Sequence, residues 1–196
     1  MKDNDTILYN VEEERPGRQL AERHLVLQDS GEELLPEINE QGDVLRAITR
    51  AEAQDGRQML LHPVVHLHVY NSQGELYLQH RAAWKAVQPD KWDTAMGGHV
   101  DYGETVRETL AREVFEEIGM RPEDYEPKFI KKYVYQNELY REMVYVFSTV
   151  YDGPLSPSET ETSGGRFWTL DEIRQNIGKG VFTPMFDQEF PTLPLP

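Results

Sequence analysis

The segment Gly97–Met120, GGHVDYGETVRETLAREVFEEIGM, decides the interpretation of this sequence. Its acidic residues are one aspartate and five glutamates, and only two arginines accompany them. Thr105 and Glu108 have the spacing of a helical capping box, and Gly119 is a typical residue for ending a helix. The segment therefore predicts a short, strongly acidic helix that begins near Thr105 and ends at Gly119.

The charges of this helix are not placed opposite its apolar side. The apolar stripe consists of Val106, Leu110, Val114 and Ile118, with Ala111 and Phe115 expected to widen it. At about 100° per residue, Glu113 and Glu117 fall within or beside the stripe, and Glu116 lies at the next edge. A buried carboxylate needs a compensating charge, and the helix contains no lysine. Three carboxylates on neighbouring turns suit Mg²⁺ or Mn²⁺.

Composition excludes several classes of function. Lys and Arg number 20 against 35 Asp and Glu, a net charge of −15, so we expect no nucleic-acid partner. No apolar run reaches the roughly 18 residues of a membrane helix, and the first residues lack the apolar centre of a signal peptide. We therefore expect a cytoplasmic protein without a membrane partner. The chain has no cysteine, which excludes disulfides, thiolate metal sites and a cysteine nucleophile.

The order of predicted elements indicates the fold class. We expect an irregular N-terminal arm at residues 1–32, one folded domain at residues 33–190 and a tail at residues 191–196. Strands are predicted on both sides of the hairpin signal Asn71–Gly74 and again after the acidic helix. A second capping box at Thr169 predicts a late helix. Strands, helix, strands and helix in this order predict an α+β sandwich.

From Gly98 onward the sequence resembles the Nudix box of the Nudix hydrolase superfamily. After Gly98 come five residues, Glu104, seven residues, Arg112-Glu113, an aliphatic residue, any residue, Glu116-Glu117, any residue, Gly119 and an aliphatic residue. No fixed position departs from the pattern, and the resemblance extends over roughly residues 33 to 190. It implies the Nudix α/β/α sandwich with a mixed β-sheet. It also implies hydrolysis of a diphosphate linkage in a small nucleoside-diphosphate-type substrate, and it allows a homodimer.

The resemblance assigns roles to individual residues. Glu113 and Glu117 would be the principal metal ligands, Glu116 and the Gly98 carbonyl further ligands, and Arg112 and Glu104 would orient them. The cofactor would be Mg²⁺ or Mn²⁺, which neutralises phosphate oxygens and activates a water for in-line attack.

The base that activates this water has more than one candidate. In Nudix relatives it is either a glutamate of the box, here Glu113, or one in a late loop. The loop Leu155–Gly165 offers Glu159 and Glu161, of which Glu161 is preferred because it is closer to the following strand. Because this loop is polar and ends in glycines, we expect it to be mobile.

A finer resemblance points to the Nudix branch that contains isopentenyl-diphosphate isomerase. It covers LHPVVHLHVYNSQGELYLQHRAAWKAVQPDKWDTAMGGHV, residues 61–100. Arg81 and Lys85 match positions that hold the diphosphate in the isomerase, and Trp92 opens the matching strand. The isomerase's metal site is matched by His62, His99 and Glu142. Whether these three residues form a second metal site is left open by the sequence.

Other positions disagree with the isomerase. Its catalytic cysteine matches Gly97, and two of its metal ligands would fall near Asp55 and at Tyr140. The box is also intact here, which favours a hydrolase over an isomerase-like enzyme or an inactive ligand-binding module. The remaining candidates are predicted to be structural. His66 and His68 are expected to be strand residues, and Trp84 and Trp92 core or pocket-wall residues, with stacking on a substrate base as the alternative for the two tryptophans.

Overall fold

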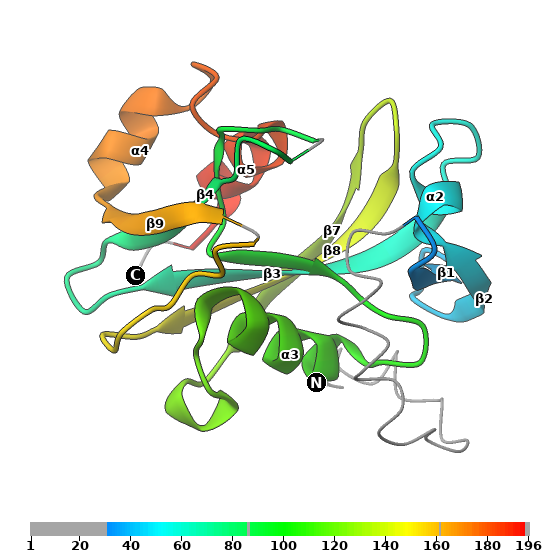
Figure 1. Ribbon diagram of the computed structural model, residues 1–196, viewed down its shortest axis with the longest axis horizontal. Coiled ribbons are helices and arrows are strands. Elements are labelled where there is room, and N and C mark those ends of the chain that lie inside the picture. Colours follow the sequence, from blue (N-terminus) through cyan, green and yellow to red (C-terminus); the bar gives the residue numbers. More distant parts are fainter. Residues whose placement is uncertain (1–30, 86, 161, 195–196) are drawn as a thin grey trace. The chain divides into compact units, whose positions relative to one another are not determined.

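The computed structural model of the protein describes residues 31–85, 87–160 and 162–194 (Figure 1). The chain divides into two compact units, and several elements have residues in both. The first unit comprises Met1–Val64, His99–Thr109 and Tyr133–Val144, and the second comprises Val65–Gly98, Leu110–Lys132 and Tyr145–Pro196. The arm expected at residues 1–32 lies almost wholly outside the described residues.

Strands dominate, and one helix exceeds two turns by a wide margin. In chain order the elements are β1 (Leu34–Ile38), β2 (Val44–Thr49), α2 (Arg50–Ala53), β3 (Leu61–Tyr70), β4 (Leu76–Arg81), β5 (Trp92–Asp93), β6 (Met96–His99), α3 (Val106–Ile118), η2 (Pro122–Asp124), β7 (Lys128–Gln136), β8 (Arg141–Val150), β9 (Thr162–Trp168), α4 (Leu170–Asn176), α5 (Pro184–Glu189) and η3 (Phe190–Thr192). The strands β1 and β2 form a separate antiparallel pair, while the larger sheet has the order β5-β4-β3-β8-β7, with β6 paired to β3 and β9 to β4. Among the described residues, no helix has both the length and the apolar character that a bilayer crossing requires.

In the first unit, a side chain closes the β1–β2 hairpin. The side-chain oxygen of Asn39 accepts hydrogen bonds of 2.9 Å from the backbone N–H groups of Gln41, Gly42 and Asp43. Such local bonds are the reason that Asn favours turns. The pair then buries Leu35 and Ile48, which pack with Ala53 of α2 in a small hydrophobic core.

In the second unit, the hairpin expected at Asn71–Gly74 is confirmed. The Asn71 side chain accepts from the backbone N–H groups of Gln73 and Glu75, and Gly74 has a φ of 78° that favours glycine. A run of aromatic side chains then forms much of the core of this unit. Neighbouring ring centroids lie 5.1 to 5.6 Å apart along the series Trp92, Trp168, Phe182, Phe186 and Phe190.

The acidic helix α3 has the bounds that its caps predict. The Thr105 hydroxyl accepts from the Glu108 backbone N–H, and the Glu108 carboxylate accepts from the Thr105 backbone N–H at 3.0 Å. At the other end, Gly119 has a φ of 73°. Phe115, however, is 55% exposed, so the expectation that it widens the apolar stripe is wrong. It lies about 140° around the helix from Leu110, beyond the buried side.

Strand β9 starts earlier than the sequence indicates. The expected loop extended to Gly165, but β9 begins at Thr162 and pairs antiparallel with β4. The glycines make this possible, because a Cβ on Gly165 would lie 2.7 Å from the Leu78 carbonyl oxygen. Glycines are typical of turns, but in β9 they allow two strand backbones to approach closely.

Candidate active site and metal centre

The box helix and strand β6 meet at a glycine. A Cβ on Gly98 would lie 2.5 Å from Cδ and 2.7 Å from Oε1 of Glu113, closer than real side-chain contacts. The Glu113 carboxylate therefore occupies the space that any other residue at position 98 would fill. This contact places the backbone of Gly98 directly against one of the proposed metal ligands.

The burial of the three glutamates agrees with the positions predicted for them on the helix. Glu113 and Glu117 are 5% and 8% exposed, whereas Glu116 is half-buried. The guanidinium of Arg112 donates to Glu113 Oε1 at 2.7 Å and to Glu116 Oε2 at 3.4 Å. The side-chain amide of Gln79 donates to Glu117 Oε2 at 3.4 Å. Arg112 therefore holds two of the three carboxylates in place and supplies positive charge beside them.

The two ends of α3 are also fixed by hydrogen bonds. At its start, in the first unit, the Thr109 hydroxyl donates to the Glu104 carboxylate at 2.8 Å. At its end, in the second unit, the carbonyls of Glu117 and Ile118 accept from the backbone N–H groups of Ser158 and Ser156, at 2.8 and 2.9 Å. The loop that was expected to be mobile is thus bonded to the end of the helix, as helix-terminal carbonyls require partners. Glu159 is exposed, and Glu161 lies outside the described residues.

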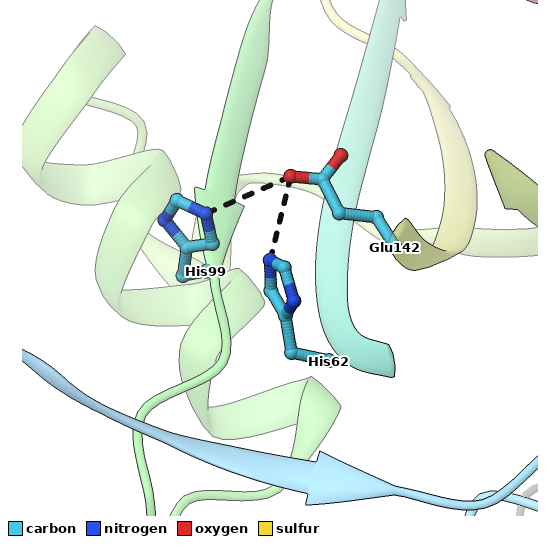
Figure 2. A group of neighbouring side chains, drawn as sticks. All are labelled: His62, His99 and Glu142. Carbon is cyan, nitrogen blue, oxygen red and sulfur yellow. Dashed lines mark ion pairs between the residues drawn. The ribbon is translucent and has the colours of Figure 1, made fainter. Parts of the chain in front are cut away.

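The first unit contains a compact group of potential metal ligands (Figure 2). One ligand atom each from His62, His99 and Glu142 lies within 4.8 Å of the other two. Glu142 Oε1 is 3.6 Å from His62 Nε2 and 3.7 Å from His99 Nε2. Burial raises the pKa of Glu142, but its interactions with His62 and His99 outweigh this effect and lower the pKa to about 2. Glu142 is therefore a carboxylate at neutral pH.

The chemistry of these three residues fits a divalent ion. His62 Nδ1 lies 3.1 Å from the Leu60 carbonyl, and its Nε2 is buried and has no hydrogen-bond partner. Metal-binding histidines usually donate their second ring nitrogen to such a carbonyl, which leaves the other nitrogen for the metal. Distances of 3.6 to 3.7 Å are too long for hydrogen bonds but leave room for an ion bonded at about 2.1 Å to each atom.

Two further residues around this group bear on the isomerase comparison. The side-chain amide of Gln54 lies 3.2 Å from His99 Nε2, a contact with no signal in the sequence. Asp55, which falls near an isomerase ligand position, accepts from the backbone N–H groups of Arg57 and Gln58. These hydrogen bonds hold the pKa of Asp55 below its usual value. The Asp55 carboxylate is therefore engaged in hydrogen bonds within its own loop.

The predicted substrate-binding residues surround the end of β4 in the second unit. Arg81 donates to the carbonyls of Val87 and Gln88, so it fixes the loop that carries half-buried Lys85. Trp92 is half-buried and stacks on His80, with ring centroids 4.8 Å apart. Trp84 is 66% exposed, so its interpretation as a core residue is wrong. It lies in a turn after β4, where the apolar pattern of the strand has ended.

Sequence reasoning missed one buried acid. Glu189, at the end of α5, contacts both His66 and His68, which supports their predicted structural role. Helix α5 begins with Thr183 as its N-cap and Pro184 in its first turn. That start signal was available in the sequence, but nothing in it paired Glu189 with strand β3.

The fold and the acid-rich helix define an α+β sandwich protein whose carboxylates suit a divalent cation. A comparison with protein families gives the same class. The chain belongs to the NUDIX domain family, whose profile matches residues 60–186. This confirms the resemblance drawn from the box and the expected Nudix fold.

Individual relatives agree with the resemblance to Nudix hydrolases and with the finer resemblance to isopentenyl-diphosphate isomerase. An uncharacterized Nudix hydrolase of Pseudomonas aeruginosa is 36% identical over 138 residues, 70% of this chain and 79% of that protein. Isopentenyl-diphosphate Delta-isomerase 1 of Photorhabdus laumondii is 29% identical over 138 residues, 66% of this chain and 77% of that protein. A crystal structure from Deinococcus radiodurans has a TM-score of 0.71 at 24% identity and covers 82% of this chain and 99% of that one.

The Gly98 contact yields a first prediction. We expect Gly98→Ala to weaken Mn²⁺ binding by at least about tenfold in calorimetry, because the added methyl group displaces the Glu113 carboxylate. The melting temperature should change little, since the far end of a glutamate side chain can move. In a Glu113→Gln background the same change should add little, as expected for coupled residues. Wild-type Mn²⁺ affinity in Gly98→Ala would contradict this.

The histidine–glutamate group yields a second prediction. His62→Asn retains an amide near the Leu60 carbonyl but removes Nε2, and Glu142→Gln removes the charge. Each variant should bind one divalent ion fewer per chain than the wild type in titrations with Mn²⁺ or Zn²⁺, because imidazole and carboxylate ligands are lost. Glu117→Gln serves as the control that affects the box instead. An unchanged number of bound ions in both variants would show that the group holds no metal.

Proposed function

We propose that the protein is a metal-dependent hydrolase that cleaves a diphosphate linkage in a nucleoside-diphosphate-type substrate. The observation that carries this proposal is the pair of buried carboxylates, Glu113 and Glu117, with Glu113 packed against Gly98. Burying two negative charges on one helix costs several kcal/mol; Arg112 offsets part of this cost through its bond to Glu113, and a divalent cation bound between the carboxylates would offset more of it. Nudix hydrolases generally use divalent metals, and the chain contains the complete box.

We infer a separate role for each residue of the box. A Mg²⁺ or Mn²⁺ ion held by Glu113, Glu116, Glu117 and the Gly98 carbonyl would neutralise phosphate charge and favour ionisation of the attacking water. Arg112 keeps Glu113 and Glu116 oriented by its two hydrogen bonds. We infer that Glu161 accepts the proton of the attacking water, with Glu113 as the alternative base. The second unit contains all of these residues.

On the substrate side, we infer that Arg81 and Lys85 contact phosphate and that Trp92 flanks the bound molecule. Lys and Arg number 20 against 35 Asp and Glu, and these two cations come from the same short segment. Arg81 also donates to the carbonyls of Val87 and Gln88, so besides the proposed phosphate contact it holds the loop that presents Lys85. The bound substrate would then be a small anionic molecule.

An isomerase-like activity is the second candidate, and a specific observation favours it. The group His62, His99 and Glu142 is preformed, and one relative is named an isopentenyl-diphosphate isomerase. Protonation of an alkene needs a well-placed acid, however, and Gly97 stands where the isomerase has its cysteine. The intact box also argues against both an isomerase and an inactive binding module.

The third prediction tests the proposed reaction. We expect Mg²⁺-dependent phosphate release from at least one member of a panel of nucleotide sugars, dinucleotides and nucleoside triphosphates. Glu117→Gln, which removes a ligand charge at nearly constant size, should lower this activity by at least about 100-fold and weaken Mg²⁺ binding. The assignment would be contradicted if no substrate released phosphate, or if Glu117→Gln kept full activity and full metal binding. Conversion of isopentenyl diphosphate to its isomer would establish the second candidate.

The fourth prediction concerns the base. A general base contributes about 10² to 10⁴ in rate, whereas an exposed surface charge contributes almost nothing. Glu161→Gln should therefore lower kcat by at least about 100-fold while calorimetry shows Mg²⁺ binding close to that of the wild type. Glu159→Gln is the matched control in the same loop. Full turnover in Glu161→Gln would move the role to Glu159 if that variant is impaired, and otherwise to Glu113.

A further inference from the structure

The histidine–glutamate group of the first unit has a fourth neighbour, Gln54. The side-chain amide nitrogen of Gln54 lies 3.2 Å from His99 Nε2, the atom that is also 3.7 Å from Glu142 Oε1. Gln54, His62, His99 and Glu142 all belong to the first unit. The half-buried Gln54 side chain is therefore within reach of a ligand that these residues would share.

The backbone holds Gln54 close to the strand that carries Glu142. Gln54 is the C-cap of α2, and its backbone N–H donates to the Arg50 carbonyl at 3.0 Å. Two residues later, the backbone N–H of Gly56 donates to the Leu139 carbonyl at 3.0 Å, and Gly56 has a φ of 68° that favours glycine. Leu139 lies just before β8, in which Glu142 is the second residue. A backbone hydrogen bond therefore joins the segment of Gln54 to the segment of Glu142.

The contact with Gln54 also indicates the form of the His99 ring. An amide nitrogen can only donate, so His99 Nε2 accepts the hydrogen bond and carries a lone pair. A neutral imidazole nitrogen with a lone pair is the form that binds a metal ion. The buried Nε2 of His62 has no hydrogen-bond partner, and Glu142 Oε1 faces both rings (Figure 2). The group thus offers two imidazole nitrogens and one carboxylate oxygen.

The distances between these atoms favour four ligands over six. Ligand atoms bonded at about 2.1 Å lie about 3.4 Å apart in a tetrahedron but only about 3.0 Å apart in an octahedron. Glu142 Oε1 lies 3.6 Å from His62 Nε2 and 3.7 Å from His99 Nε2, closer to the tetrahedral value. Four ligands that include imidazoles suit Zn²⁺, whereas Mg²⁺ prefers six oxygens.

We propose that the side-chain oxygen of Gln54 is the fourth ligand of this group, and that the completed set binds Zn²⁺ in preference to Mg²⁺. A half-turn about the Cγ–Cδ bond exchanges the amide nitrogen and oxygen without moving the backbone. Without an ion, the amide N–H occupies the lone pair of His99; with an ion, the oxygen faces the metal. This inference rests on the metal site predicted for His62, His99 and Glu142, and it does not require the proposed hydrolase activity.

A role restricted to the metal-free protein predicts the opposite result. If Gln54 only donates to His99, its amide competes with the ion for the same lone pair. Removal of the amide would then strengthen Zn²⁺ binding. If Gln54 is a ligand, its removal weakens Zn²⁺ binding, so the sign of the change separates the two roles.

The fifth prediction uses Zn²⁺ as the probe, titrated into the full chain by calorimetry with millimolar Mg²⁺ present to occupy the box. Gln54→Met retains the length of the side chain but removes both polar atoms, and should weaken Zn²⁺ binding by at least about tenfold. Gln54→Glu retains a ligand oxygen and adds a charge, so it should bind Zn²⁺ at least as tightly as the wild type. Gln41→Met, at an exposed position in the β1–β2 hairpin, is the matched control and should stay within about threefold.

Several outcomes would overturn this inference. They are Zn²⁺ binding in Gln54→Met that equals or exceeds that of the wild type, a loss in Gln54→Glu as large as in Gln54→Met, and displacement of the bound Zn²⁺ by millimolar Mg²⁺. If Gln54→Met fails to fold, Gln54→Ala tests the same loss of the amide. Unchanged Zn²⁺ affinity in Gln54→Ala would equally count against the proposal.

A further comparison separates the role of Gln54 from the metal site on which it rests. His62→Asn should lose the Zn²⁺ ion that the wild type binds in the presence of Mg²⁺. Loss of this ion in His62→Asn, with wild-type affinity in Gln54→Met, would retain the site and reject Gln54 as a ligand. Equal Zn²⁺ binding by His62→Asn and the wild type would reject the site and the role of Gln54 together.

Discussion

The contact between Gly98 and Glu113 is the constraint on which the candidate site depends. It requires a residue without a side chain in β6 and a carboxylate on the facing side of α3. The carboxylate that is costly to bury is thereby pressed against the backbone of Gly98. Packing and the proposed metal binding therefore depend on the same pair of residues, as is common at functional sites.

The two faces of strand β6 explain how one scaffold can resemble two enzymes. On one face, Gly98 admits the box glutamate that a hydrolase needs. On the other face, Gly97 stands where the isomerase has its cysteine and lies against the His66 ring. The group His62, His99 and Glu142 belongs to the first unit. The likeness to the isomerase thus lies in the body of the fold, while the differences lie at Gly97, near Asp55, at Tyr140 and in the intact box.

Features set by local sequence were predictable, and those set by distant partners were not. The hairpin at Asn71, both capping boxes and the burial of Glu113 and Glu117 follow from spacing and short-range hydrogen bonds. The contact between Glu189 and His66 joins residues 123 positions apart, and no local pattern signals it. The early start of β9 was missed because glycines suit both turns and close strand packing, and only the partner β4 decides between them. Phe115 was misplaced by extending the apolar stripe too far around the helix.

The two hydrogen bonds that join Ser156 and Ser158 to the last carbonyls of α3 give the late loop an unexpected property. Helix ends normally fray, and surface loops normally exchange their amide protons quickly. Here the loop limits fraying of the helix and the helix limits opening of the loop, because both motions must break the same two hydrogen bonds. The amides of Ser156 and Ser158 should therefore exchange with solvent at the slow rate of the helix. The loop and the carboxylates of α3 would then move as one mechanical element when a substrate enters.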